Sequence, residues 1–367
     1  MNVLHVMNML CFSGAEIMYV DAAEEFKNLG CNLFVINAHE KLGPYASAFE
    51  DAGYKVMHLP YPKNPIRRVR YYYDLIKFVK KHHIDVIHTH NSGMKWGMAL
   101  VAKLCGIRSV YTVHNNFRSR TISWPYHFWL RWSASHLLGC RFQSISDSVY
   151  DNERNYYYNP TTKVYNWYGN RRFYPAMPGE KSAIRKELGI HDESLVIISI
   201  GGCSDVKRHY HIINELPRII ESYPNMVYLH LGEGVTLNDE IEQAKSLGVE
   251  KYVRFLGNQK NVRKYLIASD VFIMPSRFEG ISITAIETLA CKIPEILYNV
   301  PGLRDFNFDS ECALIIEPEE QNIPEAIKQL MSNPEMVKRH VENGAALVYS
   351  KYYLPTNIKE IFKLYVD

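Results

Sequence analysis

The stretch VFIMPSRFEGISITAIETLAC, residues 271–291, joins a short apolar run to a segment that looks helical. The run VFIMPS is typical of a buried strand. We expect Glu279 and Gly280 to lie in the turn and the helix to begin near Ser282. Because Gly280 has no side chain, backbone N–H groups there can approach a ligand closely. The amino end of a helix supplies unpaired N–H donors and a positive dipole end, so this turn suits a phosphate group.

Two carboxylates flank the beginning of this helix. Glu287 follows eight residues after Glu279, which corresponds to at most about 12 Å along a helix axis. That span suits a diphosphate with a sugar near one carboxylate and a ribose near the other, because carboxylates accept hydrogen bonds from paired hydroxyls. An alternative stays open: Thr284 and Glu287 also have the spacing of a capping box, and Glu279 is then an ordinary loop acid.

Strand and helix patterns alternate along both halves of the chain. The apolar runs are 2–7, 32–37, 54–59, 85–90 and 109–114 in the first half, and 194–202, 226–234, 252–258, 271–276, 294–299 and 312–318 in the second. The stretch 166–182, rich in Gly, Pro and Asn, looks like a linker between them. Repeated strand–helix units predict an α/β fold of two doubly wound, Rossmann-like parallel-sheet domains that face an interdomain cleft.

Glycines stand just after the predicted strands, where open α/β sheets bind ligands. They are Gly14, Gly201, Gly202, Gly232, Gly234, Gly257 and Gly280.

Composition restricts the class of protein. Hydrophobic residues make up 47% of the 367 residues and charged residues 22%, which is typical of a globular chain long enough for two domains. A net charge of +3 does not suggest a nucleic-acid partner. No segment has the roughly 18–20 apolar residues of a membrane span, and the first residues lack the features of a signal peptide. Seven cysteines without a CxxC pair indicate reduced thiols, so we expect a cytoplasmic protein.

The stretch PSRFEGISITAIETLACKIP, residues 275–294, resembles the signature of the retaining glycosyltransferases of family 4, which have the GT-B fold. Other motifs follow in that family's order and spacing: SGAE (13–16), DVIHTHN (85–91), YTVHN (111–115), SISDSV (144–149), VYNWY (164–168), IGGCSDVK (200–207), LHLGEG (229–234) and VRFLGNQKNV (253–262). The resemblance covers essentially the whole chain. It implies an acceptor-side domain over 1–168, a domain that binds a nucleotide-sugar over 169–348, and a C-terminal helix over 349–367 that packs toward the first domain.

The resemblance also implies a reaction. A hexose or N-acetylhexosamine passes from a nucleotide-sugar, expected to be a UDP-sugar, to a hydroxyl of a glycan or lipid-linked acceptor in surface polysaccharide synthesis. The anomeric configuration is retained, and no metal or other cofactor is expected. His114, Glu279 and Lys207 are the implied catalytic residues: His114 lies near the sugar, Glu279 binds the sugar, and Lys207 stabilises the leaving diphosphate. Glu287 is implied to hold the nucleotide ribose.

The implied donor site is larger than these residues. It comprises Gly14, Gly201, Gly202, Lys207, Gly257, Asn258, Glu279, Gly280, Ile281, Ser282 and Glu287. In one place the sequence departs from the family pattern, because Gly202 stands where an arginine is usual. An expected diphosphate contact is therefore missing, and Arg208 and His209 are the candidates to replace it. The first loop, SGAE, also lacks the usual double glycine.

Two further groups of residues invite a function. We expect His88 and His90 to lie on opposite faces of a strand and not to share a metal, so no metal site is predicted. The stretch RRVRYYYDLIKFVKK, residues 67–81, combines basic and apolar residues. It predicts a helix that rests on an anionic bilayer, which would place the protein peripherally on the inner face of the plasma membrane. An ordinary amphipathic helix with a solvated face is the alternative.

Other functions stay open on the sequence alone. An enzyme that does not transfer the sugar, such as an epimerase, and a silent nucleotide-sugar-binding protein fit the same scaffold, the latter in view of Gly202. An NAD-dependent oxidoreductase ranks last, because MLCFSGAE, residues 9–16, lacks the G-x-G-x-x-G pattern after the first strand.

Overall fold

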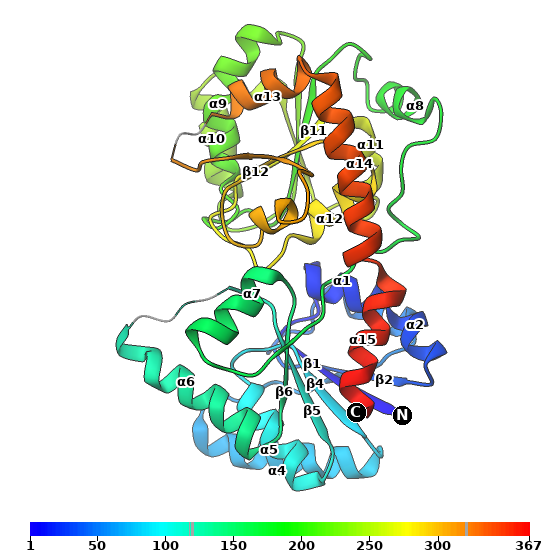
Figure 1. Cartoon of the computed structure of the whole chain (residues 1–367), viewed down its shortest axis with the longest axis vertical. Helices are drawn as coiled ribbons and strands as arrows, with labels where there is room; N and C mark the ends of the chain where they lie inside the picture. The colour runs from blue at the N-terminus through cyan, green and yellow to red at the C-terminus, as the bar shows by residue number, and fades with distance from the viewer. Residues whose placement is uncertain (117, 119–120, 320–321) are drawn as a thin grey trace. The chain divides into compact units, whose positions relative to one another are not determined.

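The computed structural model describes residues 1–116, 118, 121–319 and 322–367 of the chain. These residues divide into two compact units. The first unit consists of Met1–Trp167 together with Leu354–Asp367, and the second is Tyr168–Tyr353. Figure 1 traces the chain from its blue N-terminus to its red C-terminus.

The first unit is built on a seven-stranded sheet with the order β3-β2-β1-β4-β5-β6-β7, in which neighbouring strands are parallel. The strands are β1 Asn2–Met7, β2 Asn32–Asn37, β3 Lys55–His58, β4 Val86–Thr89, β5 Arg108–Val113, β6 Arg141–Ser144 and β7 Thr162–Lys163. The α-helices are α1 Gly14–Asp21, α2 Ala23–Asn28, α3 Ala46–Asp51, α4 Pro65–Lys81, α5 Lys95–Cys105, α6 Trp124–Trp132, α7 Asp147–Asp151 and α15 Leu354–Val366.

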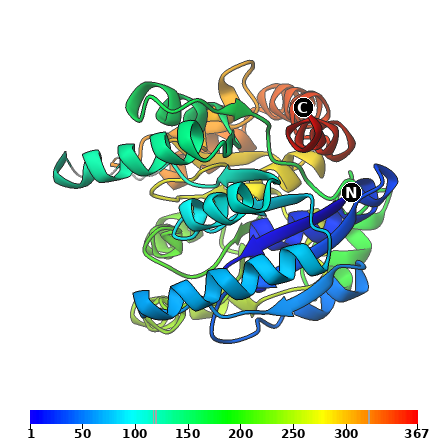
Figure 2. The same cartoon turned by 90° about the horizontal axis from the view of Figure 1, so that it is seen from below.

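Helices lie on both faces of this sheet. On one face α4 and α5 are neighbours (Figures 1 and 2), and their apolar side chains pack with Leu4 and Val6 of β1 in one buried cluster. Side chains alternate between the faces of a strand, so His5 points to the other face, where its ring contacts Tyr19 of α1. The C-terminal helix α15 also packs on this unit, and the hydroxyl of Tyr365 lies 2.6 Å from the buried His88 Nδ1.

The second unit contains a six-stranded parallel sheet with the order β10-β9-β8-β11-β12-β13. Its strands are β8 Val196–Ile200, β9 Val227–Leu231, β10 Val253–Gly257, β11 Val271–Met274, β12 Glu295–Tyr298 and β13 Leu314–Ile316. Its α-helices are α8 Glu180–Glu187, α9 His209–Ser222, α10 Leu237–Ser246, α11 Val262–Ala268, α12 Ile283–Ala290, α13 Ile323–Met331 and α14 Pro334–Lys351.

The two parallel, Rossmann-like sheets confirm the predicted fold class. The predicted runs 2–7 and 32–37 match β1 and β2 to the residue. Strands β6 and β7 were not predicted, because β6 is the polar sequence RFQS and β7 has only two residues. Between β1 and β2 the chain forms two helices, α1 and α2, which meet at Ala22.

The order of strands reverses once in each sheet. In the first unit the reversal falls between β1 and β4, and in the second between β8 and β11. Because ligands of open α/β sheets bind beyond the carboxyl ends of the strands at this switch point, the loops that follow these four strands are the places to look for a site.

Two further expectations concern the cysteines and membrane-spanning segments. All seven cysteines are free thiols. Within the described part of the chain, every helix is too short or too polar to span a bilayer.

Candidate active site

The turn between β11 and α12 ends at a capped helix. The Ser282 hydroxyl accepts a hydrogen bond from the backbone N–H of Ala285 at 3.1 Å, and the backbone of Ser282 is extended. The helix therefore begins directly after Ser282. With Ser282 as the cap, Glu287 lies in the second helical turn, where a capping box with Thr284 does not form. The capping-box interpretation of Glu287 is wrong.

Lys207 and Glu279 form an ion pair at the switch point of the second sheet. The Lys207 Nζ lies 2.7 Å from Oε1 of Glu279, and both side chains are mostly buried. Lys207 is in the loop after β8 and Glu279 in the loop after β11. The backbone N–H of Arg277 donates to the carbonyl oxygen of Val206 at 2.8 Å, so the two loops are joined directly. A cation and an anion thus meet where this class of sheet binds ligands.

The turn at Glu279 packs against Gly302, which is not among the predicted site residues. Gly302 has a φ of +82°, and a Cβ at this position would lie 2.4 Å from the carbonyl oxygen of Glu279 and 2.9 Å from that of Gly280. The backbone N–H of Glu279 also donates to the Pro301 carbonyl oxygen at 3.1 Å. No side chain fits between this segment and the turn. The Pro-Gly pair after β12 is the signal that pointed to a tight turn here.

Glu287 is a buried carboxylate close to a guanidinium. It is 6% exposed, and its Oε1 lies 4.0 Å from Nη2 of Arg172. A carboxylate held in this way can accept hydrogen bonds from the hydroxyl groups of a ligand. Arg172 is not among the predicted site residues, because it lies in the stretch 166–182, whose composition indicates only a linker.

Gly257 and Asn258 lie beside another carboxylate, that of Glu233. Asn258 Nδ2 donates to Glu233 Oε2 at 3.0 Å, and a Cβ at Gly257 would lie 2.8 Å from Glu233 Oε1. The Gly257 carbonyl oxygen accepts from the backbone N–H of Gly232 at 3.0 Å. The loops after β9 and β10 therefore form one polar group at the carboxyl edge of the sheet, and Glu233 is its charged member.

Gly201 and Gly202 begin the loop that leads to Lys207. A Cβ at Gly201 would lie 3.2 Å from Cε of Lys207, so the lysine side chain lies along this glycine. Gly202 is exposed. Of the two residues expected to replace the missing arginine, His209 is unsuited: its ring nitrogens lie 2.9 Å from Ser199 Oγ and 3.2 Å from the Gly201 carbonyl oxygen.

Burial also lowers the pKa of His209 to about 3, so its ring is uncharged near neutral pH. Arg208 is the candidate that remains. Its φ is +52°, a left-handed conformation that non-glycine residues adopt infrequently and that is concentrated at functional sites.

One buried cluster of the second unit has the spacing of metal ligands. The ligand atoms of Cys203, His230 and Glu240 lie within 4.8 Å of one another. However, His230 Nε2 is 2.8 Å from Glu240 Oε2, and the other oxygen of Glu240 accepts from the Thr236 hydroxyl. The second ring nitrogen of His230 has no hydrogen-bond partner in the described residues, whereas a metal-bound histidine usually donates from it. The cluster fits a hydrogen-bonded network better than a metal site.

In the first unit, His114 directly follows β5 and is the first of three histidines that lie in a row. His114 Nε2 lies 3.1 Å from His90 Nδ1, and His90 Nε2 lies 3.1 Å from His5 Nδ1. Burial lowers the pKa of His114 to about 4 and that of His90 well below its ordinary value. The rings are therefore neutral at physiological pH.

The prediction that His88 and His90 lie on opposite faces is wrong. Their ring centroids are 4.3 Å apart, because residues two positions apart along a strand share a face. Together with His5 they have the spacing of metal ligands. Both ring nitrogens of His88 are nevertheless occupied at 2.6 Å, by the hydroxyls of Tyr365 and Thr112. The group again fits a hydrogen-bonded network better than a metal site.

Gly14 is the exposed first residue of α1. The hydroxyl of the preceding Ser13 is hydrogen-bonded to the carboxylate of Glu16, whose pKa is raised by burial. Gly14 and His114 belong to the first unit, and the other predicted site residues belong to the second.

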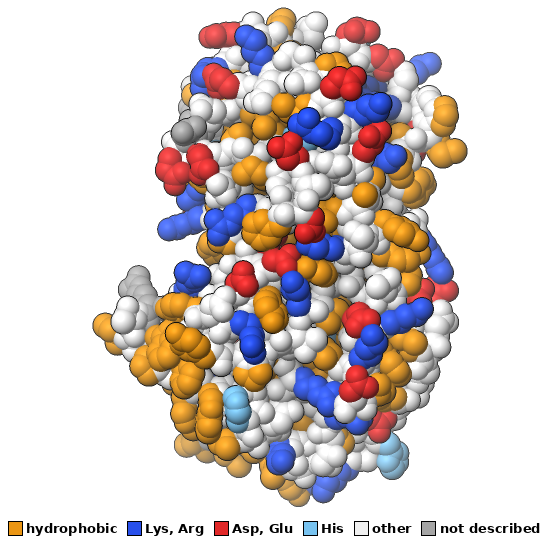
Figure 3. Space-filling view, viewed as in Figure 1, with side chains coloured by type: hydrophobic (Ala, Val, Ile, Leu, Met, Phe, Trp, Pro, Cys, Tyr) orange, Lys and Arg blue, Asp and Glu red, His pale blue; other side chains and the backbone are white. Residues whose placement is uncertain are grey.

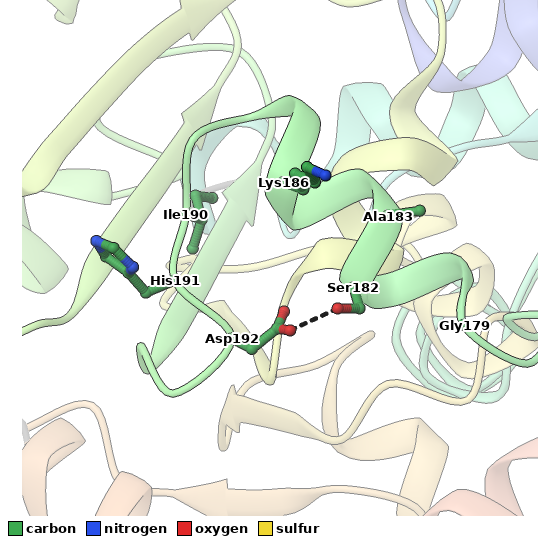
Figure 4. A pocket seen from close by; sticks show the side chains of 7 residues that line it. All are labelled: Gly179, Ser182, Ala183, Lys186, Ile190, His191 and Asp192. Atoms are coloured by element: carbon green, nitrogen blue, oxygen red, sulfur yellow. Dashed lines mark hydrogen bonds between the residues drawn. The ribbon is translucent and has the colours of Figure 1, made fainter.

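A hollow on the second unit is unrelated to these residues. It has a volume of about 470 Å³ and lies between α8 and the loop that leads to β8, with Lys186, His191 and Asp192 among its lining residues (Figure 4). It is thus at the amino end of the strand whose carboxyl end carries Gly201. None of the predicted site residues lines it.

Comparison with known protein families matches both halves of the chain. Residues 12–176 match the model described as Glycosyltransferase Family 4, and residues 180–347 match that of the Glycosyl transferases group 1.

Individual relatives are similar over most of their length. The chain is 25% identical to an Escherichia coli UDP-Gal:alpha-D-GlcNAc-diphosphoundecaprenol alpha-1,3-galactosyltransferase, over 82% of this chain and 80% of that protein. It is also 25% identical to an alpha-monoglucosyldiacylglycerol synthase of Acholeplasma laidlawii, over 97% and 94%. Among solved structures, HepE of Anabaena in complex with UDP has a TM-score of 0.84 with 16% identity, over 99% of both chains. This last likeness shows that the fold is shared, in agreement with the GT-B expectation.

Proposed function

Because this chain belongs to the glycosyltransferases of group 1 and family 4, we propose that it is a retaining enzyme that uses a UDP-sugar. It transfers a hexose or N-acetylhexosamine to a hydroxyl of a glycan or lipid-linked acceptor, in the synthesis of a surface polysaccharide. The E. coli relative is named for a UDP-sugar donor and a diphosphoundecaprenol-linked acceptor, and structures of the Anabaena protein contain UDP or UDP-glucose. These names support the choice of donor and acceptor.

The single observation that carries the proposal is the Lys207–Glu279 pair beside the capped end of α12. Lys207 is proposed to stabilise the diphosphate that leaves, together with the N–H groups near Gly280. Fixed donors aimed at developing negative charge are usually the largest catalytic contribution. Glu279 is proposed to bind the sugar, and Glu287 the ribose. For His114 and Gly14, which belong to the first unit, the roles implied by the family resemblance are proposed as well.

A binding screen followed by a transfer assay tests this function. UDP and UDP-sugars are expected to raise the unfolding temperature, whereas GDP and GDP-sugars are not, because a ligand of the folded state stabilises it. The UDP-sugar that binds is then incubated with an undecaprenyl-diphosphate-linked sugar, and the product anomer is determined by NMR. The expected product has the anomeric configuration of the donor. An inverted product contradicts the retaining mechanism, and binding without any transfer favours a silent nucleotide-sugar-binding protein.

We also propose that α4, which contains the stretch 67–81, contacts an anionic membrane. The exposed side of this helix carries apolar side chains among the basic ones: Ile66 is 81% exposed and Val69 73%. An ordinary solvated helix face would be polar, so this combination favours an interfacial helix. Arg68 is not part of that surface, because it donates to the carbonyl oxygens of Pro62 and Lys63.

The helix α6 supports the same proposal. Large apolar side chains are exposed along it and in the turn before it, among them Ile122, Tyr126 and Trp129. Figure 3 shows hydrophobic side chains gathered over this helix. Aromatic and basic residues together are typical of the region where a protein meets lipid headgroups.

Liposome flotation tests the membrane proposal. The doubly substituted variant Arg67→Glu, Arg70→Glu is expected to lose flotation with vesicles that contain anionic lipid. A matched variant, Lys328→Glu, Lys338→Glu, changes the same charge on exposed residues of α13 and α14 and is expected to float like the wild type. Equal flotation of the Arg67, Arg70 variant and the wild type would contradict the proposal.

A further inference from the structure

A continuous row of three histidines connects the site residue His114 to the core of the first unit. We propose that His90 and His5 are positioning residues: the hydrogen-bonded chain His5–His90–His114 holds His114 in one neutral tautomer. The inference rests on the proposed role of His114 in the transfer reaction. It assigns a purpose to two histidines that the donor site itself does not include.

The sheet topology brings the three rings together. Strands β1, β4 and β5 are adjacent and parallel, so their carboxyl ends lie at the same edge. His5 is in β1, His90 directly follows β4, and His114 directly follows β5. The distance between the facing nitrogens is 3.1 Å at both links, which is within the range of an N–H···N hydrogen bond.

The chain restricts where the protons are. A neutral imidazole has one N–H donor and one acceptor nitrogen. Each link joins a δ nitrogen of one ring to an ε nitrogen of the next. If His5 donates to His90, then His90 donates to His114, and every ring is protonated at Nδ1. If the chain runs the other way, every ring is protonated at Nε2. In both cases the three rings share one tautomer, and no ring changes it alone.

Burial keeps the three histidine rings neutral. His5 is fully buried, and burial lowers its pKa to about 3 and that of His114 to about 4. Tyr19 keeps the rings in place, because its ring centroid is 4.4 Å from that of His90 and 4.9 Å from that of His5. His5 Nε2 has no hydrogen-bond partner among the residues that the structure describes, so the row of hydrogen-bonded histidines ends at His5.

His88 belongs to a separate network and provides an internal reference. Gln143 Nε2 donates to the Val164 carbonyl oxygen, and its Oε1 accepts from the Thr112 hydroxyl. The Thr112 oxygen is then left to accept from His88 Nε2 at 2.6 Å. His88 is thus expected to be protonated at Nε2 whatever the state of the other rings.

NMR of the protein with ¹⁵N-labelled histidine rings tests the chain without any activity measurement. Signals are assigned by single substitutions of each histidine. In the wild type, His5, His90 and His114 are each expected to show one protonated and one unprotonated nitrogen, with the same nitrogen protonated in all three. In His90→Leu, the His114 signals are expected to move toward an average of the two tautomers. Averaged signals in the wild type, or His114 signals that do not change in His90→Leu, would overturn the proposal.

Kinetics then test whether the chain serves the reaction. His90→Leu is expected to lower kcat about 10-fold or more with little change in the donor KM, because a misplaced catalytic group costs rate more than binding. His90→Asn retains an amide near the place of the histidine Nδ1 and is expected to recover part of kcat. His340→Leu removes another buried histidine, in α14, and is expected to leave kcat unchanged.

The outcomes separate the positioning role from the proposed function. A kcat of His90→Leu equal to that of the wild type, or a loss in His90→Asn as large as in His90→Leu, would overturn the positioning role. If His114→Ala is fully active while the NMR signals show a shared tautomer, His114 has no part in transfer and the positioning role falls with it. If transfer is absent from the wild type, the proposed function fails, and the NMR result still decides whether the chain exists.

Discussion

Lys207 and Glu279, from the loops after β8 and β11, are joined by an ion pair of 2.7 Å in the second unit. The pair stands where the strand order of the sheet reverses. Without a donor, each residue therefore partly neutralises the other. Under the proposed function, a diphosphate at Lys207 competes with the Glu279 carboxylate, and a sugar hydroxyl at Glu279 competes with the ammonium group. The proposal therefore couples the release of one residue to the binding of both parts of the donor.

Removal of the carboxylate charge is expected to separate binding from turnover. Glu279→Gln keeps the shape of the side chain and frees Lys207, so UDP should bind a few-fold more tightly. This gain corresponds to about 0.5–1 kcal/mol for a partly exposed pair. The rate of transfer should fall, because the amide is a poorer acceptor for a sugar hydroxyl. Calorimetry with UDP and steady-state kinetics measure the two effects, and weaker UDP binding in Glu279→Gln would contradict the competition.

Gly302 is expected to be essential to the turn at Glu279. In Gly302→Ala, the new Cβ meets the carbonyl oxygens of Glu279 and Gly280, so the turn must move and UDP affinity should fall. Gly248→Ala is a matched control: this glycine also has a positive φ, of +67°, but its Cβ would have no neighbour within 4 Å. Both variants should lose about 1–2 kcal/mol of stability from the backbone conformation. Equal UDP affinities for the two variants would rule out the supporting role of Gly302.

Glu295 predicts an unusual dependence of stability on pH. It is fully buried in β12, neither carboxyl oxygen has a hydrogen-bond partner within the described residues, and burial raises its pKa well above the ordinary value. Its proton is therefore held in the folded state at a pH where the unfolded chain has lost it. This contribution to stability is complete below the unfolded pKa of about 4.5 and decreases as pH rises toward the folded pKa, by about 1.4 kcal/mol per pH unit.

Glu295→Leu removes the buried carboxyl group and its pH dependence. The variant should be more stable than the wild type at pH 7, by about 1–3 kcal/mol, and the difference should increase from pH 5 to pH 8. Urea unfolding at several pH values measures it. Glu193→Leu, at an exposed glutamate, should show no such increase. A difference between Glu295→Leu and the wild type that shrinks as pH rises would contradict the assignment.

Much of the fold was predictable because parallel strands buried on both faces are continuous apolar runs. The runs of β1 and β2 gave their boundaries to the residue. Strand β6 was not predicted, because its buried Gln143 is hydrogen-bonded to Thr112 and Val164, which lie elsewhere in the chain. Hydrogen-bond partners that are distant in the sequence cannot be predicted from a local pattern.

The candidate site shows the same limit. The turn at Gly280 and the helix after Ser282 are local features, and the sequence predicted both. Arg172 and Glu287 are distant in the sequence and come together only in the folded chain. Gly302, in the segment after β12, packs against the turn at Glu279 and Gly280. The error about His88 and His90 had a different origin, since strand periodicity places residues two apart on the same face.

The central claim is that Glu287 and the turn at Gly280 bind the nucleotide, and titration calorimetry with UDP tests it most directly. Glu287→Ala removes a buried carboxylate proposed to accept from the ribose hydroxyls. A hydrogen bond to a charged group is worth about 1.5–3 kcal/mol, so the UDP dissociation constant should rise roughly 10- to 100-fold. The exposed control Glu250→Ala should bind UDP like the wild type. Equal UDP affinity for Glu287→Ala and the wild type would contradict the account.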